Sequence, residues 1–114
     1  MACIEAITGP QDELKRRVEQ FRLRRDKIVE GLNSIKGLKC VKPRGAFYVF
    51  PNIKYFGKSS AEMADYLLNE AGVATLPGGS FGSYGEGYIR ISYANSMENI
   101  DKAIAQIEYA LSKL

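Results

Sequence analysis

The sequence has no histidine and no tryptophan, and it has only two cysteines among its 114 residues. Without histidine, it lacks the commonest general base, the commonest metal ligand and the imidazole of Ser–His and Cys–His nucleophile pairs. Cys3 and Cys40 do not form a C-x-x-C motif, so their spacing indicates neither a zinc site nor a disulfide scaffold. We therefore expect reduced thiols in a cytoplasmic protein, with no metal site and no catalytic residue in this chain.

Long apolar runs and a strong excess of one charge are also missing. No segment approaches the roughly 20 apolar residues that a membrane-spanning helix needs, and the first residues show no secretory signal. The net charge of +3 is too small by itself to argue for nucleic acid. A 114-residue chain that is 46% hydrophobic predicts one domain with its own core and neither a membrane nor a nucleic-acid partner.

Three segments have the apolar period of a helix. The first is predicted to begin near Thr8-Gly9-Pro10 and to end at Gly37. The second lies between a cap at Ser59, with Glu62 completing a capping box, and Gly72. The third begins at Ser96. The side chains predicted to face the core are Leu14, Val18, Phe21, Ile28, Leu32 and Ile35, then Met63, Leu67 and Ala71, then Ile100, Ala103, Ile104, Ile107, Leu111 and Leu114.

Between these helices the sequence indicates short strands. Residues 38–41 and 46–50 are separated only by a turn around Pro43-Arg44-Gly45, which favours an antiparallel hairpin. Two further strands are predicted at 73–76 and 88–93. The predicted fold class is α+β: a two-layer sandwich in which helices pack on one face of a small, mainly antiparallel or mixed sheet.

Arg90 is the most informative residue because it interrupts an apolar strand. Its guanidinium stays charged and is costly to bury alone, so it must find an anion. Strand alternation places Ile89 and Ile91 on one face and Arg90 on the other, where a ligand can reach it. The glycine-rich loop before the strand lets the backbone approach whatever Arg90 binds. Arg90 therefore has two kinds of interpretation. It recognises a small carboxylate, or it is structural, either paired with Glu86 or placed as an inward charge that protects an edge strand.

Three other segments have competing interpretations. The aromatic run 47–50 favours a central strand covered on both faces over a base-stacking platform. Residues 52–59 are one glycine short of a P-loop, and a helix cap at Ser59 explains them better than an NTPase. The basic residues of the first helix alternate with acidic ones, which favours ion pairs on a solvated face over a nucleic-acid patch.

Six segments follow one another with an order and spacing that are specific together: 8–12 (TGPQD), 21–26 (FRLRRD), 43–51 (PRGAFYVFP), 71–74 (AGVA), 77–82 (PGGSFG) and 88–94 (YIRISYA). They are distributed from residue 8 to residue 94, so the pattern that they form spans most of the chain. They resemble the C-terminal small domain of fold-type I, pyridoxal-phosphate (PLP)-dependent aminotransferases, in the aspartate-aminotransferase-like class I/II branch.

The resemblance implies a role for each part of the chain. Arg90 would bind the substrate α-carboxylate, the loop with Gly78 and Phe81 would line the site entrance, and the first helix would join a larger domain. In the family, the Schiff-base lysine and the other PLP-binding residues belong to that large domain. None of the nine lysines here lies in the family's serine-rich cofactor context. PLP is therefore expected to be bound by the missing large domain and not by this chain alone.

The resemblance also implies an organisation and an activity for the whole enzyme. Residues 1–114 would form the C-terminal domain, with residues 1–9 a remnant of the interdomain segment. The full enzyme would be a cytoplasmic homodimer that transfers an amino group between an aspartate-like amino acid and 2-oxoglutarate. The isolated chain is expected to fold but neither to bind PLP specifically nor to transaminate. The alternatives left open are a non-catalytic small-molecule-binding or regulatory α+β module and a nucleic-acid binder that uses the first helix.

Overall fold

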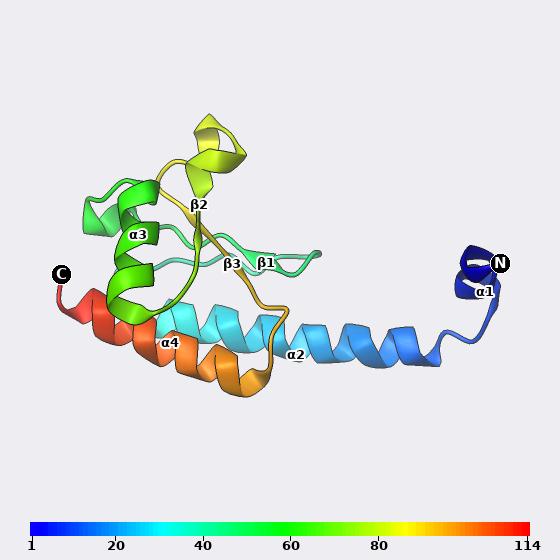
Figure 1. Ribbon diagram of the computed structural model, residues 1–114. Coiled ribbons are helices and arrows are strands. Elements are labelled where there is room, and N and C mark those ends of the chain that lie inside the picture. Colours follow the sequence, from blue (N-terminus) through cyan, green and yellow to red (C-terminus); the bar gives the residue numbers. More distant parts are fainter.

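The computed structural model describes residues 1–114, which form four α-helices, three short strands and three 3₁₀ turns (Figure 1). The helices are α1 (Ala2–Thr8), α2 (Asp12–Ser34), α3 (Ser60–Ala71) and α4 (Met97–Ser112), the strands are β1 (Tyr48–Val49), β2 (Leu76–Pro77) and β3 (Ile89–Ser92), and the turns are η1 (Lys54–Phe56), η2 (Gly78–Phe81) and η3 (Ser83–Gly85). None of the helices combines the length and the apolarity needed to cross a membrane.

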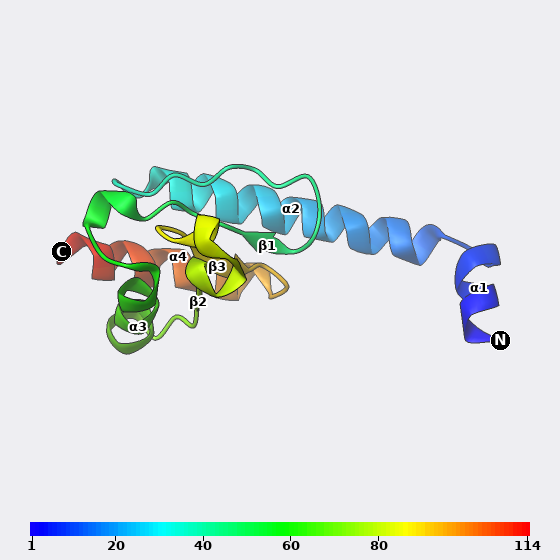
Figure 2. The same cartoon turned by 90° about the horizontal axis from the view of Figure 1, so that it is seen from above.

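The three strands form one antiparallel sheet in the order β1-β3-β2. Within the central strand β3, Ile89 and Ile91 are buried, whereas Arg90 and Ser92 lie on the other face. Helices α2 and α4 lie side by side against the apolar face, and α3 flanks β2 (Figures 1 and 2). The predicted α+β sandwich, with helices against one face of a small sheet, is confirmed.

The helix ends follow the punctuation expected from the sequence. The Ser59 hydroxyl accepts a hydrogen bond from the Glu62 amide, and the Glu62 carboxylate accepts one from the Ser59 amide, so the predicted capping box is formed. Gly72 ends α3 in the left-handed conformation (φ 64°), which glycine adopts without a steric cost. The Ser96 hydroxyl caps α4 by accepting from the Asn99 amide.

The predicted hairpin between residues 38–41 and 46–50 is wrong. The first segment makes only one bridge, Lys39 with Asn52, while β1 pairs with β3. The side chain of Asn33 replaces the missing partner strand, because it accepts a hydrogen bond from the Cys40 amide and donates one to the Cys40 carbonyl, both at 2.8 Å. Because the Asn33 side chain of α2 satisfies the hydrogen-bonding capacity of the Cys40 amide and carbonyl, Cys40 needs no partner strand.

Two further strand predictions need correction. The aromatic run 47–50 is not a central strand, because β1 is an edge strand in which Val49 is buried and both Phe47 and Phe50 are about two-fifths exposed. The strand predicted at 73–76 begins only at Leu76 and continues to Pro77. Residue 73 instead closes the end of α3, since its amide donates to the Leu67 carbonyl.

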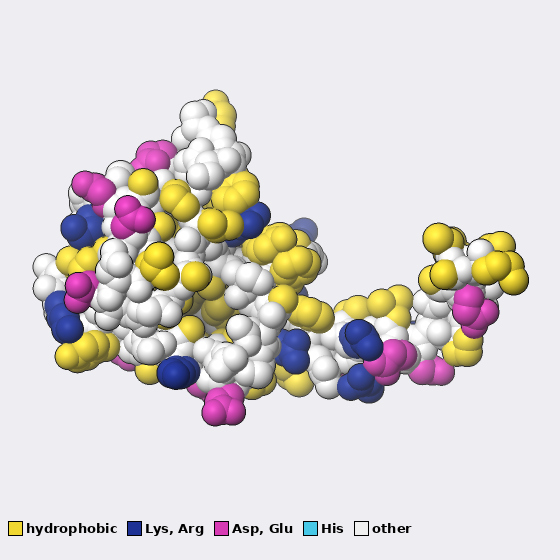
Figure 3. Space-filling model, viewed as in Figure 1, with side chains coloured by type: hydrophobic (Ala, Val, Ile, Leu, Met, Phe, Trp, Pro, Cys, Tyr) yellow, Lys and Arg dark blue, Asp and Glu magenta, His cyan; other side chains and the backbone are white.

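The first helix differs most from its predicted core face. Ile28, Leu32 and Ile35 are buried as expected, but Leu14 and Val18 are more than half exposed. The amino-terminal half of α2 extends beyond the sheet and carries the separate short helix α1, which the sequence did not predict (Figures 1 and 2). This arm gives the molecule a long axis of 51 Å against 30 and 22 Å for the others. Hydrophobic side chains are visible on it in Figure 3.

The remaining predicted core positions hold with small exceptions. Met63, Leu67 and Ala71 of α3 are buried, as are Ile100, Ile107 and Leu111 of α4. Ala103 and Ile104 are partly buried and pack against the same core, while Leu114 is half exposed at the chain end. The core therefore lies where the apolar faces of α3, α4 and the carboxyl-terminal half of α2 meet the sheet.

Candidate functional site

Arg90 lies in the middle of β3, on the face of the sheet that the helices do not cover. Its neighbours Ile89 and Ile91 are 1% and 6% exposed on the core side, so alternation directs Arg90 away from the core. Arg90 is partly exposed and takes part in none of the chain's ion pairs. Its N–H donors are therefore directed neither into the core nor to an acidic side chain of this chain.

Two aromatic rings pack against the Arg90 guanidinium. The guanidinium carbon lies 4.3 Å from the centre of the Tyr48 ring and 4.1 Å from the centre of the Phe81 ring. The register explains the first contact: Tyr48 pairs with Ser92, which shares a face with Arg90 two residues away. Phe81 is the last residue of η2 and lies within the glycine-rich loop that precedes β3. Such cation–π contacts hold a guanidinium without occupying its N–H donors.

Glu86, the structural partner considered for Arg90, is bound elsewhere. Its two carboxylate oxygens accept hydrogen bonds from the amide and the hydroxyl of Ser60, at 2.8 and 2.6 Å. These bonds to the Ser60 side chain and backbone hold the pKa of Glu86 below its ordinary value. Ser60 is 1% exposed, and its hydroxyl oxygen also accepts a hydrogen bond from the Gly79 amide at 3.4 Å. The alternative ion pair between Glu86 and Arg90 is absent, and Glu86 instead ties the loop to α3.

The structure gives the glycines of this loop a different role from the one that the sequence indicated, which was close approach of the backbone to a ligand. Gly78 is buried, and its amide donates to the Tyr88 carbonyl at 2.8 Å. A Cβ on Gly78 would lie 2.1 Å from the Gly85 carbonyl oxygen, and one on Gly85 would lie 2.0 Å from the Gly78 oxygen. These glycines allow two parts of the loop to pack backbone against backbone. The structure thus explains Gly78 by a contact within the loop, and its proposed contact with substrate stays a prediction.

The turn before β1 is held from both sides. Ala46 has a positive φ of 58°, which is rare outside glycine. The buried Tyr93 donates a hydrogen bond from its phenol to the Ala46 carbonyl at 2.8 Å, and its amide donates to the Phe47 carbonyl at 2.9 Å. Burial raises the pKa of that phenol. Tyr93 therefore fixes the start of β1 and, through it, the place of Tyr48.

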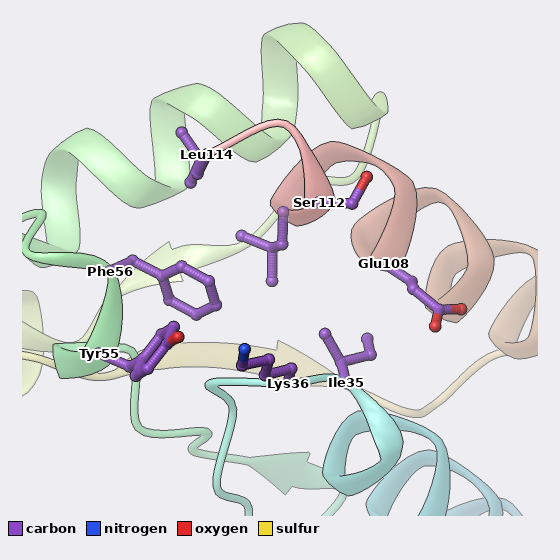
Figure 4. A pocket seen from close by; sticks show the side chains of 8 residues that line it. Ile35, Lys36, Tyr55, Phe56, Glu108, Ser112 and Leu114 are labelled. Carbon is purple, nitrogen blue, oxygen red and sulfur yellow. The ribbon is translucent and has the colours of Figure 1, made fainter.

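The largest cavity lies elsewhere, between the end of α2, η1 and the end of α4 (Figure 4). It measures about 440 Å³ and has a mainly apolar lining that includes Phe56 and Leu111, with Lys36 and Glu108 also at its wall. Neither Arg90 nor the two rings against it belong to this lining. The chain also holds no cluster of three side chains suited to a metal ion. The geometry therefore concentrates on Arg90 as the candidate binding residue.

Comparison with known proteins identifies the family. A family model for class I and II aminotransferases matches residues 1–107. The chain belongs to this aminotransferase family. It is 44% identical over 112 residues to a probable N-acetyl-LL-diaminopimelate aminotransferase of Bacillus subtilis, covering 98% of this chain and 28% of that protein. It is 42% identical over 116 residues to the aspartate aminotransferase of Pyrococcus horikoshii, covering 97% and 29%.

Solved aminotransferase structures show the same fold. The alanine aminotransferase of Pyrococcus furiosus superposes with a TM-score of 0.95 at 36% identity, over 99% of this chain and 29% of that one. The chain thus spans less than a third of the length of the aminotransferases that it matches. The resemblance predicted from its six sequence segments is confirmed.

Class I and II aminotransferases depend on PLP. The side chains around Arg90 do not fit that cofactor: they are aromatic, and no lysine amine stands among them. Lys54, Lys58 and Lys113 lie over tyrosine rings, and Lys27 and Lys42 pair with aspartates. A site for PLP needs an amine and a phosphate-binding set, and the two rings against Arg90 supply no amine.

Sequence reasoning missed two members of the site. Tyr48 was interpreted as part of a core strand, although its pairing with Ser92 places it beside Arg90. Ser60 was not singled out, because its polar partners Glu86 and Gly79 lie 26 and 19 residues away in sequence. A signal was present for Tyr48, since alternation within 47–50 places it on the face opposite Val49. The sequence held no comparable signal for Ser60.

Proposed function

We propose that this chain is the C-terminal small domain of a PLP-dependent aminotransferase and that Arg90 binds the α-carboxylate of the amino-acid or 2-oxo-acid substrate. The observation that supports this most is the environment of Arg90. Its charged guanidinium lies on the face of the sheet that the helices leave uncovered, packs against two aromatic rings and has no acidic partner. A planar fork of N–H donors matches a carboxylate at two points. Family membership then supplies the class of carboxylate, an amino acid and its oxo acid.

The contribution of Arg90 to the reaction would be positional. A carboxylate held at two points loses its freedom to rotate, which presents the Cα–H bond to the reacting group in one orientation. The loop that contains Gly78 and Phe81 lies beside Arg90, and we propose that these two residues line the entrance to the site. The cofactor and the group that moves the proton would come from the large domain, which precedes this region in the family.

The proposed substrates are an aspartate-like amino acid and 2-oxoglutarate. The support is the name of the relatives, several of which are aspartate or aspartate/prephenate aminotransferases. The Arg90 site recognises the end that all amino acids share, so its geometry is neutral between substrate side chains. The choice would be made in the large domain.

The proposal includes residues 1–9 as part of the interdomain segment, a homodimer and a cytoplasmic location. The arm formed by α1 and the first half of α2 exposes Ile4, Ile7, Leu14 and Val18, an apolar surface that a large domain or a second subunit would cover. Cys3 and Cys40 are both free thiols, as expected in a reducing compartment.

Replacing Arg90 by lysine in the full-length enzyme tests the proposal. The variant is expected to lose roughly 2–4 kcal/mol of transition-state binding for dicarboxylic and monocarboxylic amino acids alike, because a forked contact becomes a point charge. The measurement is kcat/KM for an aspartate-like and an alanine-like substrate. Unchanged kinetics would remove Arg90 from the site.

A second test uses the 114-residue chain alone. We expect no saturable 1:1 uptake of PLP, as measured by absorbance, and no transamination, because the Schiff-base lysine and the phosphate-binding residues belong to the large domain in this family. Tight amino-acid binding by this chain, measured by calorimetry, would favour the alternative of a non-catalytic binding module.

A further inference from the structure

An arginine binds a carboxylate best when its planar guanidinium is already held in one orientation. The side chain has several rotatable bonds, and each bond frozen on binding weakens the affinity. A fork that is already ordered before the ligand arrives avoids that loss. The usual means is a carboxylate behind the arginine, but none of the ion pairs in this chain includes Arg90.

Two rings take that place. Tyr48 and Phe81 come from different elements, β1 and η2, and lie 4.3 and 4.1 Å from the guanidinium carbon. Aromatic faces attract a cation through their quadrupole and prefer it stacked, which leaves the in-plane N–H donors free. Neither ring competes with a ligand for those donors.

The rings are themselves held in place. Tyr48 packs against Phe47 with ring centres 4.4 Å apart, and Phe81 meets Phe50 edge to face at 5.9 Å. The loop that carries Phe81 is tied to α3 through Ser60, which binds both Glu86 and Gly79. Each ring therefore has a support that does not depend on Arg90.

We propose that Tyr48 and Phe81 are positioning residues, which order the Arg90 guanidinium so that its N–H edge meets an incoming carboxylate in its own plane. The inference rests on the proposed function of Arg90 and deepens it. It assigns a role to Tyr48, which the sequence placed in the core, and it gives Phe81 a role through the arginine in addition to lining the entrance.

A double-mutant cycle in the full-length enzyme tests the proposal, with the dissociation constants of succinate and propionate as probes that need no turnover. Tyr48→Leu and Phe81→Leu are each expected to weaken both probes about three- to thirty-fold, the range of a partly desolvated cation–π contact. In an Arg90→Leu background, the same two changes are expected to alter binding less than twofold, because nothing is left to position.

Two matched variants serve as controls. Tyr48→Phe keeps the ring and is expected to bind within about twofold of the wild type. Tyr109→Leu removes an exposed ring that lies 4.2 Å from the Lys113 amine, a comparable cation–π pair at the carboxyl-terminal end of α4. That change is expected to leave both dissociation constants unchanged. A loss with Tyr48→Phe equal to that with Tyr48→Leu would overturn the stacking role of the ring.

The outcomes separate this proposal from the one it rests on. If Arg90→Leu leaves binding unchanged, the carboxylate-binding role fails, and positioning fails with it. If Arg90→Leu weakens binding but the ring variants in the wild-type background bind normally, only positioning is overturned. Equal losses in both backgrounds would mean that the rings act on the fold and not through Arg90. A ligand-free measurement distinguishes positioning from misfolding. In the wild type, the Arg90 Nε–H resonance is expected to be shifted by the ring currents of Tyr48 and Phe81. In Tyr48→Leu and in Phe81→Leu it is expected to move toward the free-arginine value while the circular dichroism stays that of the wild type, and an unmoved resonance would overturn the positioning role.

Discussion

Arg90 shows how one residue serves the sheet and a site at the same time. Its backbone belongs to the central strand, while its side chain lies on the face opposite Ile89 and Ile91. Buried in the core, the guanidinium would need a charged partner. On the uncovered face, two rings suffice. The charge is thereby held without being neutralised.

The loop beside it depends on two residues without side chains. Gly85→Ala is expected to lower the free energy of unfolding by about 1–3 kcal/mol, because its Cβ would lie 2.0 Å from the Gly78 carbonyl oxygen and the backbone must move. Gly45→Ala is the matched control: a Cβ there meets nothing within 4 Å, so stability should stay unchanged or rise by up to about 1 kcal/mol. Urea unfolding of the three chains checks this, and equal stability of all three would refute the tight loop packing.

At the scale of elements, the start of α3 combines two separate devices. Ser59 and Glu62 form a capping box within the helix, while Glu86 reaches the next residue, Ser60, from the distant loop. The four free amides at a helix start favour a nearby carboxylate. The same helix end therefore anchors both its own first turn and the loop that carries Phe81.

This anchor predicts a pH dependence. Because the pKa of Glu86 is lowered in the folded state by the Ser60 hydroxyl and amide, its contribution is fully present above the ordinary carboxyl pKa of 4.5 and is lost as the pH falls through the lowered value. Glu86→Gln is expected to make the acid side of the stability curve shallower than in the wild type, as measured by urea unfolding from pH 7 to pH 3.

The lowered carboxyls of Glu13, Glu19 and Asp26 are shared by both proteins and cancel in that comparison. The pKa of Glu62 is lowered by Ser59 and raised by the charge of Glu86, so removing that charge lowers the Glu62 pKa further, and the Ser60 variant below separates the two effects. Ser60→Ala removes the largest cause of the shift, so in that background Glu86→Gln should change the slope less. An identical slope difference with and without the Ser60 hydroxyl would show that the shift has another origin.

At the scale of the whole molecule, α2 divides into a buried half and an exposed half. Its carboxyl-terminal half packs through Ile28, Leu32 and Ile35, while Leu14 and Val18 on the other half are exposed. Ion pairs between Glu13 and Arg16, Glu13 and Arg17, and Glu19 and Arg22 cover its polar side, confirming the expected i,i+3 and i,i+4 pairing. These pairs engage Arg16, Arg17 and Arg22 within the helix, so α2 offers less free positive charge to a nucleic acid than its composition indicated.

The division of α2 predicts that substitutions in its two halves affect the stability of the chain differently. Ile28→Ala is expected to lower the unfolding free energy of the 114-residue chain by about 2–5 kcal/mol, because it opens a cavity in the core. Leu14→Gln with Val18→Gln should change it by less than about 0.5 kcal/mol. In the full-length enzyme, the double variant should instead weaken assembly, seen as dissociation in analytical ultracentrifugation. Normal assembly would mean that the arm is not an interface.

Local rules within the sequence determined the fold class, the capped helices and the outward side of Arg90. Each follows from interactions over a few residues. The capping box of Ser59 and Glu62 begins α3, Gly72 ends it, and the alternation of side chains along 88–93 places Arg90 opposite Ile89 and Ile91. Contacts between distant segments were not accessible in this way. The Asn33 side chain hydrogen-bonds the backbone of Cys40 where a hairpin partner was predicted. Leu14 and Val18, in the amino-terminal half of α2, were predicted to be buried but are exposed because no other element packs against them.

The sequence by itself thus determined that a charged strand residue and a glycine-rich loop follow each other in an α+β domain. Only the tertiary structure decided what surrounds that charge, because the partners come from segments far apart in the chain: Tyr48 through β-sheet register, Phe81 through a loop tied to Ser60. Periodicity and capping act along neighbouring residues, whereas register and loop closure are set by which distant backbones pair.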